Sequence, residues 1–411
     1  MQVELLTVGS ELLSGATLNT NAVELARRLA GLGLPCRRQL AVSDDPVHLR
    51  EALQEALGRA RLLVITGGLG PTFDDRTVDA IAAVTGRPLV WRPDIARRVR
   101  RFYSRRRRRL QQAALRQARV PRGAEPLPNP IGTAPGIWLP LPSAILVALP
   151  GVPAEMRAMW DRSVAPRLRR LPGRQLAITR TLRTAGMVEL SIEAVLRRLR
   201  LPRTVDIGLY PNLRMVDVRI TATRGASRTV AHVEAALRRG LGAAVYGTGD
   251  ETLEGVIGAL LLRRRATVAV AESCTGGGVA DRLTNVPGSS RYFVGGVIAY
   301  ANRLKLQPLG VTERTLQRWG AVSAPTARRM AEGIRRVAAA DVSVAITGIA
   351  GPSGGTARKP VGLVYVAVAD WRGAAVQRHR FFGDRAAIKA QAAQAALDAL
   401  RLRLIGDSHR L

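Results

Sequence analysis

Cysteine, histidine, lysine and aromatic residues are all scarce in this chain of 411 residues, and each scarcity narrows what the protein can be. The two cysteines, Cys36 and Cys274, are too few and too far apart in the sequence for a disulfide framework. No apolar run approaches the roughly 18 residues that a membrane span needs. The first residues, MQVELLTVGSELL, have no basic region before their apolar part, so they predict a strand rather than a signal peptide. We therefore expect a soluble cytoplasmic protein with no membrane contact.

Arginine has almost completely replaced lysine. Of the 63 basic residues only Lys305, Lys359 and Lys389 are lysines, and the arginines are spread over every segment. We interpret the net charge of +32 as an effect of composition, with a polyanion-binding surface as the alternative, and specific nucleic-acid binding is not expected. The densest basic run, 105–109, has few stacking aromatics nearby, which favours a solvated helix face. Arginine cannot deprotonate in a protein, so the three lysines are candidates for positions that use a neutral or compact amine, with survival by chance as the alternative.

Strand-like and helix-like patterns alternate through residues 1–170 and again through 250–411. Such alternation favours parallel sheets flanked by helices, in which ligands bind beyond the carboxyl ends of the strands. Residues 171–249 combine strand patterns with two amphipathic helices and lack a GXXG loop. We predict an α/β protein in which two three-layer α/β domains with mainly parallel sheets are joined by a small α+β domain.

One hydroxyl in the C-terminal segment has two plausible catalytic partners. An apolar run at 266–271 breaks at Glu272-Ser273-Cys274-Thr275 and is followed by three glycines and a helical pattern. About thirty residues later a second apolar run ends near Tyr300 and Lys305. Serine, tyrosine and lysine near loop ends can make a metal-free set of nucleophile and base. Two alternatives stay open, because a serine before a helix is commonly only an N-cap and because Cys274 is a rival nucleophile, although no histidine lies beside it.

Five motifs along the chain point to one family. They are TGGLGPTFDD at 66–75, GTAPG at 132–136, LPGVPAEM at 149–156, AESCTGG at 271–277 and TGIAGP at 347–352. Together they resemble the CinA family, the competence/damage-inducible proteins of bacteria, over essentially the whole chain. The resemblance implies a molybdopterin-binding-like domain at 1–170, a KH-like connecting domain at 171–249, a nicotinamide mononucleotide deamidase domain at 250–411, and a homodimer.

For the C-terminal domain the resemblance implies conversion of nicotinamide mononucleotide to nicotinate mononucleotide and ammonia in pyridine-nucleotide salvage, without a cofactor. Ser273 would be the nucleophile, with Lys305 and Tyr300 as base and proton relay. Thr347 would be a further catalytic hydroxyl. The expected substrate contacts are Gly276 and Gly277, whose amides would form an oxyanion hole or hold the phosphate, together with Gly348 and Arg385.

For the N-terminal domain the resemblance implies metal-dependent hydrolysis of ADP-ribose, that is, an ADP-ribose pyrophosphatase. Pyrophosphate hydrolysis calls for carboxylates that hold a divalent metal ion and for glycine loops that admit phosphates. We expect Asp75, Asp44 and Glu155 as metal ligands. Acidic residues after a glycine turn are also ordinary helix-start residues, which is the plainer explanation. The expected substrate contacts are Gly67, Gly68, Glu11 and Thr133.

The sequence departs from the family pattern at one place. Ala114 stands where a polar asparagine is typical, before Leu115-Arg116-Gln117-Ala118, and the basic run 105–109 lies close by. This departure weakens the expectation of an N-terminal activity. The alternatives are a molybdopterin-type binding protein and, in a different class, a competence-related DNA-binding factor without catalysis.

Overall fold

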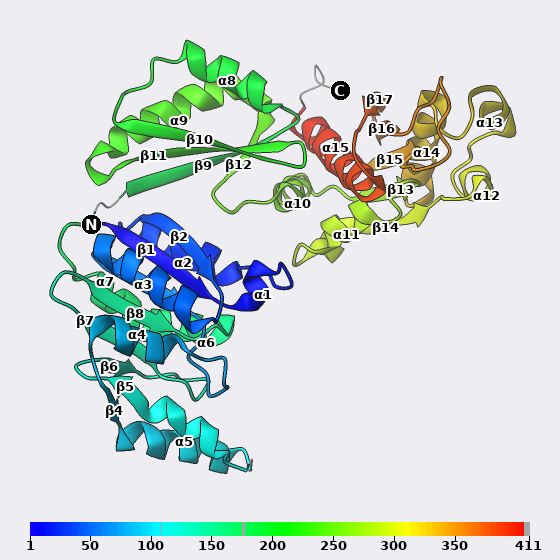
Figure 1. Ribbon diagram of the computed structural model, residues 1–411. Coiled ribbons are helices and arrows are strands. Elements are labelled where there is room, and N and C mark those ends of the chain that lie inside the picture. The colour runs from blue at the N-terminus through cyan, green and yellow to red at the C-terminus, as the bar shows by residue number, and fades with distance from the viewer. Residues whose placement is uncertain (108, 175–176, 407–411) are drawn as a thin grey trace. The chain divides into compact units, whose positions relative to one another are not determined.

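Two units make up the computed structural model, Met1–Ala177 and Ile178–Leu411 (Figure 1). The structure describes residues 1–107, 109–174 and 177–406, so Arg108 of the basic run lies outside the described residues. Within these ranges no helix is long and apolar enough to cross a membrane.

The first unit is built on a six-stranded sheet. Its order is β2 (Cys36–Val42), β1 (Val3–Val8), β3 (Leu62–Thr66), β8 (Ile145–Leu149), β7 (Gly136–Pro140) and β6 (Glu125–Leu127). The first four strands are parallel to one another. β7 pairs antiparallel with β8, and β6 pairs antiparallel with β7. Successive apolar side chains of β3 point to opposite faces, with Leu62 and Val64 in one core cluster and Leu63 and Ile65 in the other. The strand is therefore apolar throughout because both faces of the sheet are covered.

Helices pack on both faces of this sheet. One face carries α2 (Thr20–Gly31), α6 (Pro153–Met159), the π-helical turn at Trp160–Val164 and α7 (Ala165–Leu168). The other carries α3 (Pro46–Arg59) and α4 (Thr77–Thr85). Outside these layers are α1 (Ser10–Leu13), β4 (Leu89–Trp91), α5 (Pro93–Arg105), a 3-10 helix at Gln112–Ala118 and β5 (Arg119–Pro121). Ala114 is buried in a small separate core between α5 and that 3-10 helix.

The second unit begins with the predicted α+β module. Its elements are β9 (Ala177–Ala185), α8 (Glu189–Arg198), β10 (Val205–Asn212), β11 (Met215–Thr223), α9 (Ser227–Leu241) and β12 (Val245–Thr248). The sheet has the order β10-β11-β9-β12. Alternate residues of β11 are buried against apolar residues of α9 that recur at helical spacing, so one amphipathic helix and one half-buried strand build this small core.

The rest of the second unit is again a three-layer α/β structure. Its sheet order is β14 (Phe293–Ile298), β13 (Val268–Glu272), β15 (Val342–Gly348), β16 (Leu363–Asp370) and β17 (Gly373–Arg380). The first three strands are parallel, and β16 and β17 form an antiparallel hairpin. The helices are α10 (Leu253–Arg264), α11 (Gly278–Thr284), α12 (Asn302–Leu306), α13 (Glu313–Trp319), α14 (Ala324–Val337) and α15 (Arg385–Ile405).

The two faces of this sheet differ in side-chain size. In β13, Val268 and Val270 face the layer of α10, α11 and α15, whereas Ala269 and Ala271 face α14. β15 and β16 repeat the pattern, with valine or isoleucine on the first face and Ala345, Ala367 and Ala369 on the second. The small alanine side chains let α14 pack close to the backbone of the sheet. The predicted α/β architecture with mainly parallel sheets is confirmed.

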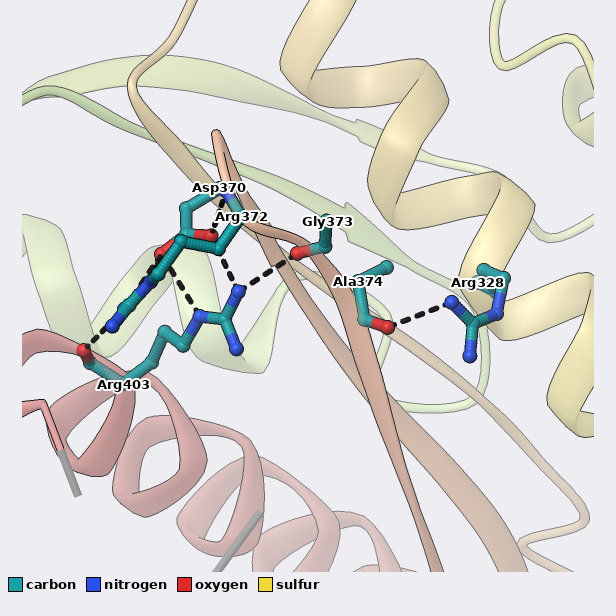
Figure 2. A network of polar contacts seen from close by, with 6 residues as sticks. All are labelled: Arg328, Asp370, Arg372, Gly373, Ala374 and Arg403. Atoms are coloured by element: carbon teal, nitrogen blue, oxygen red, sulfur yellow. Dashed lines mark hydrogen bonds and ion pairs between the residues drawn. The ribbon is translucent and has the colours of Figure 1, made fainter. Parts of the chain in front are cut away.

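A buried ion-pair network ties the end of α15 to the β16–β17 hairpin (Figure 2). The Asp370 carboxylate accepts hydrogen bonds from Arg403 of α15 and from Arg372. Arg403 also donates to the Gly373 carbonyl at 2.9 Å. Burial by itself would raise the pKa of Asp370, but the two guanidinium groups outweigh it and lower the pKa to about 2.

We expect Asp370→Asn to destabilise the second unit by about 3–5 kcal/mol, because it leaves the buried Arg403 without a counter-charge. The pKa of Asp370 is lower in the folded state than the roughly 3.9 of an unfolded chain. Its stabilisation is therefore complete above about pH 4 and is lost as the pH falls toward 2. Hydrogen exchange of the α15 amides under native conditions measures both effects.

The matched control is Glu193→Gln, which breaks an exposed i,i+4 pair with Arg197 in the same unit. Exposed pairs of this kind contribute at most about 0.5 kcal/mol. If the two variants changed the protection of the α15 amides from hydrogen exchange equally, the Asp370 network would not stabilise the helix.

Candidate active site

Ser273 lies directly after β13, at the turn into α11, and its hydroxyl contacts the amine of Lys305. The distance from Nζ to Oγ is 3.3 Å. Both side chains are buried, and only 1% of the Lys305 surface is exposed. Lys305 is carried by the short helix α12, which follows β14, the parallel neighbour of β13. The structure therefore brings together two side chains that the sequence analysis assigned to one site.

The Lys305 amine has three neighbours. It donates to the Ala299 carbonyl at 2.6 Å and to the Tyr300 carbonyl at 3.1 Å, and the third neighbour is the Ser273 hydroxyl. A carbonyl can only accept, so two N–H groups of the amine are committed, and a neutral amine keeps its lone pair for the serine proton. Burial lowers the pKa of Lys305, and the nearby Cys274 opposes this only in part. The surroundings thus increase the fraction of neutral amine, the form that a general base needs.

Glu272, the last residue of β13, has a role that the sequence analysis missed. Its carboxylate is fully buried and accepts the backbone N–H groups of Gly277, Val279 and Ala280 at 2.8–3.2 Å. It therefore occupies the start of α11, where backbone N–H groups would otherwise attract an anion. The signal in the sequence is an acidic residue at the end of an otherwise apolar strand.

This capping changes the role predicted for the glycine amides. The Gly276 N–H donates to the Ser273 carbonyl at 3.2 Å and the Gly277 N–H donates to Glu272, so neither amide is available for the predicted oxyanion hole or phosphate contact. The two glycines instead line an open pocket of about 900 Å³, which we call the loop pocket. Its other polar lining residues include Thr275, Arg385, Lys389 and Gln394.

Cys274, the rival nucleophile, is buried in the core beneath the sheet. Burial raises the pKa of its thiol to about 12, because a thiolate there would lose its hydration. At neutral pH the side chain is a thiol packed among apolar residues. Its sulfur packs against Gly348, because a Cβ added to Gly348 would lie only 3.0 Å from the sulfur.

Tyr300 and Arg385 contact each other rather than the Ser273 hydroxyl. The Tyr300 side chain is exposed, and its hydroxyl accepts a hydrogen bond from Arg385 at 2.8 Å. Only the backbone carbonyl of Tyr300 contacts Lys305. Arg385, the first residue of α15, also donates to the Gly351 carbonyl at 2.7 Å. In this arrangement the phenol is positioned by Arg385 and is not joined to Lys305 as the predicted proton relay requires.

Thr347 and Gly348 end β15 beside the turn that carries Ser273. The Thr347 hydroxyl is buried and donates to the Ala321 carbonyl at 2.8 Å, so it is already used within the protein. A Cβ on Gly348 would lie 2.6 Å from Val364 and 2.9 Å from the Leu363 carbonyl. Close packing of β15 against β16 therefore requires glycine at this position. This packing role is independent of the predicted contact between Gly348 and substrate.

The N-terminal candidates lie at one edge of the first unit's sheet. β1, β2, β3 and β8 are parallel, so the residues that follow them meet at their carboxyl ends. Glu11 follows β1, Asp44 follows β2, and Glu155 follows β8. Gly67 and Gly68 follow β3, and a Cβ on Gly67 would lie 2.2 Å from the Val8 carbonyl. This glycine is therefore required where the loop passes the end of β1.

The three predicted metal ligands do not form a ligand set. Asp75 accepts hydrogen bonds from Thr72. Asp44 accepts the Ser10 N–H at 2.8 Å, and Glu155 accepts the Asn129 amide at 2.6 Å. Among the residues that the structure describes, no three histidine, cysteine, aspartate or glutamate side chains gather as a metal site. These residues do not fit a divalent metal centre, and we derive no metal-dependent step from them.

A small pocket of about 110 Å³ lies at the same edge and is lined by Glu11, Thr66 and Asn21. The Asn21 amide donates to Thr66 and to the Gly151 carbonyl, but its buried oxygen has no partner in the described part of the chain. Sequence reasoning missed Asn21, which looks like an ordinary helix-start residue. Thr133 lies in the neighbouring loop, where a Cβ on the adjacent Gly132 would meet Glu155.

Three family models match successive parts of the chain. They describe a probable molybdopterin binding domain at 4–170, the KH domain of the damage-inducible protein CinA at 179–247, and the CinA C-terminal domain at 250–404. A CinA-like protein of Parasynechococcus marenigrum is 46% identical, with 99% of each chain covered. The chain belongs to the CinA family. The resemblance carried by the five motifs is thereby confirmed.

Other similar proteins carry related names. A CinA-like protein of Salinibacter ruber is 44% identical, with 98% of this chain and 99% of the relative covered. A crystal structure of the competence/damage inducible protein CihA from Agrobacterium tumefaciens is 39% identical and covers 37% of this chain and 93% of its own, with a TM-score of 0.36. This CinA family member thus has a molybdopterin-binding-like domain, a CinA KH domain and a CinA C-terminal domain in that order.

Proposed function

We propose that the C-terminal domain is an amidohydrolase that converts nicotinamide mononucleotide to nicotinate mononucleotide and ammonia, with Ser273 as nucleophile. The observation that carries the proposal is the Lys305 amine, buried and 3.3 Å from the Ser273 hydroxyl. A buried lysine with a lowered pKa can remove the serine proton without a histidine or a metal ion. The choice of substrate rests on the family resemblance, and the cationic loop pocket beside the serine supports a nucleotide.

The reaction proceeds in two steps through an acyl-enzyme. Neutral Lys305 accepts the Ser273 proton as Oγ attacks the carboxamide carbon of the substrate. The resulting ammonium, adjacent to the new C–O bond, stabilises the negative charge of the tetrahedral intermediate. It then returns a proton to the leaving nitrogen, and ammonia departs. Water, deprotonated by the same amine, hydrolyses the ester and releases the carboxylate.

The N-terminal domain has the weaker case for catalysis. Hydrolysis of ADP-ribose with a divalent metal ion stays a prediction, and the separate hydrogen bonds of Asp44, Asp75 and Glu155 do not favour it. Binding of a molybdopterin-type ligand at the Glu11 edge is the alternative. The homodimer and the absence of specific nucleic-acid binding are likewise expectations of this proposal.

Ammonia release from nicotinamide mononucleotide, with and without a chelator, tests the proposed function. We expect release that the chelator does not reduce, because serine and lysine perform the chemistry. Release that stops on chelation and returns with added metal would contradict the mechanism. Absence of release under both conditions would contradict the proposed substrate.

A further inference from the structure

The loop pocket contains unpaired polar groups that point to a ligand. Four buried side-chain polar atoms in the described part of the chain have no hydrogen-bond partner, and two of them belong to residues lining this pocket. They are the Thr275 hydroxyl and the Gln394 Nε2, on side chains that are 97% and 98% buried. Leaving such groups unpaired costs about 1–3 kcal/mol each, so a bound group that pairs with them is favoured.

The charges around the loop pocket favour an anion. Arg385 and Lys389 stand one turn apart at the start of α15. Arg282 is paired with Glu254 and donates to the side-chain oxygen Oε1 of Gln394, and Asp281 is the acidic residue of the lining. Lys389 has no ion-pair partner among the described residues, and its amine is 3.6 Å from where a Cβ on Gly276 would lie. The amine therefore lies in van der Waals range of the loop that follows Ser273.

We infer that the loop pocket binds the phosphate monoester of the substrate, with Lys389 as its cation and Thr275 and Gln394 as hydrogen-bond donors. This inference rests on the proposed function and adds the residues that distinguish a nucleotide from a nucleoside. A phosphate oxygen accepts from an ammonium, a hydroxyl and an amide alike. Thr275 is two residues from the nucleophile, so one turn presents Ser273 to Lys305 and Thr275 to the pocket.

Part of the lining of the loop pocket is apolar. This part includes Leu213 of the β10–β11 turn and Met215 at the start of β11, both in the KH domain. The backbone of that turn is held by a hydrogen bond from the Gly186 N–H to the Arg214 carbonyl, and the Arg214 guanidinium lies 5.2 Å from the Phe381 ring centre. Apolar residues in the lining lower the local dielectric constant and so strengthen ionic contacts made to a bound phosphate.

Kinetics of Lys389→Met, compared with Lys359→Met as control, tests the assignment. Lys359 contacts the Trp319 carbonyl and does not line the pocket. We expect Lys389→Met to raise KM for nicotinamide mononucleotide about 10–100-fold with little change in kcat, as for one charge-assisted hydrogen bond. Turnover of nicotinamide riboside, which has no phosphate, is expected to be unchanged. Lys389→Arg, which keeps the charge, is expected to restore most of the affinity.

Calorimetric binding of ribose 5-phosphate separates this inference from the proposed function. We expect the wild type and Ser273→Ala to bind it, Lys389→Met and Thr275→Val to bind at least about 10-fold more weakly, and Thr275→Ser to bind normally. This pattern in a protein that releases no ammonia would leave the phosphate site standing and refute the deamidase. Binding that is undetectable in the wild type, or unaffected by Lys389→Met and Thr275→Val, would overturn the inference.

Discussion

Replacing Lys305 with arginine is expected to reduce deamidation at least about 10³-fold, although the positive charge is kept. The guanidinium cannot lose its proton near neutral pH, so it has no lone pair for the Ser273 hydroxyl. Its planar fork also cannot reproduce the two contacts of the amine with the Ala299 and Tyr300 carbonyls. The expected loss is in kcat and is measured by ammonia release at saturating nicotinamide mononucleotide.

The same replacement at Lys359 is the matched control. Lys359 donates to the Trp319 carbonyl near the surface, so Lys359→Arg is expected to keep full activity. Circular dichroism and thermal unfolding of both variants establish that each is folded. If a folded Lys305→Arg protein retained more than about a tenth of wild-type turnover, Lys305 would not be the base.

The pH dependence of the wild-type enzyme gives a second readout of the same amine. Burial lowers the Lys305 pKa, so the active neutral form accumulates at lower pH than for an exposed lysine. We expect kcat/KM to increase with pH through an apparent pKa below the ordinary lysine value of about 10.4. This rising limb is expected to disappear in the residual activity of Lys305→Arg.

Strands with strong patterns could be predicted from the sequence almost to the residue. The apolar part of MQVELLTVGSELL forms β1, and the apolar run at 266–271 corresponds to β13 within two residues. Both strands are mainly apolar because helices cover both faces of each sheet. β2 and β17 are edge strands with mostly exposed or half-buried residues, GAAVQRHR in β17, so their patterns do not reveal a strand.

The pairing of Ser273 with Lys305 could be predicted because each follows the end of an apolar strand and neighbouring parallel strands end at one edge. The roles of individual polar groups could not be predicted from the sequence. Whether a glycine amide is free depends on Glu272, whose carboxylate folds back onto the start of α11. The separation of Asp44, Asp75 and Glu155 could not be predicted for a related reason, because each carboxylate accepts a hydrogen bond from a different partner, Ser10, Thr72 or Asn129.

Ser273→Ala and Cys274→Ala, taken together, decide which of two adjacent residues is the nucleophile. We expect Ser273→Ala to lose about 10³–10⁶-fold in kcat, since an alanine leaves Lys305 with no group to activate. Cys274→Ala is expected to keep most activity, because burial raises the thiol pKa to about 12 and the side chain only packs in the core.

The melting temperature is expected to fall more in Cys274→Ala than in Ser273→Ala, the reverse of the order expected for activity. Cys274 is 5% exposed, so Cys274→Ala leaves a small cavity beside Gly348 and lowers the melting temperature, whereas Ser273→Ala removes one hydrogen-bonding group and changes it less. Mass spectrometry of enzyme quenched during turnover locates the acyl group directly. A nicotinoyl adduct on Ser273 supports the assignment, and an adduct on Cys274, or full activity in Ser273→Ala, contradicts it.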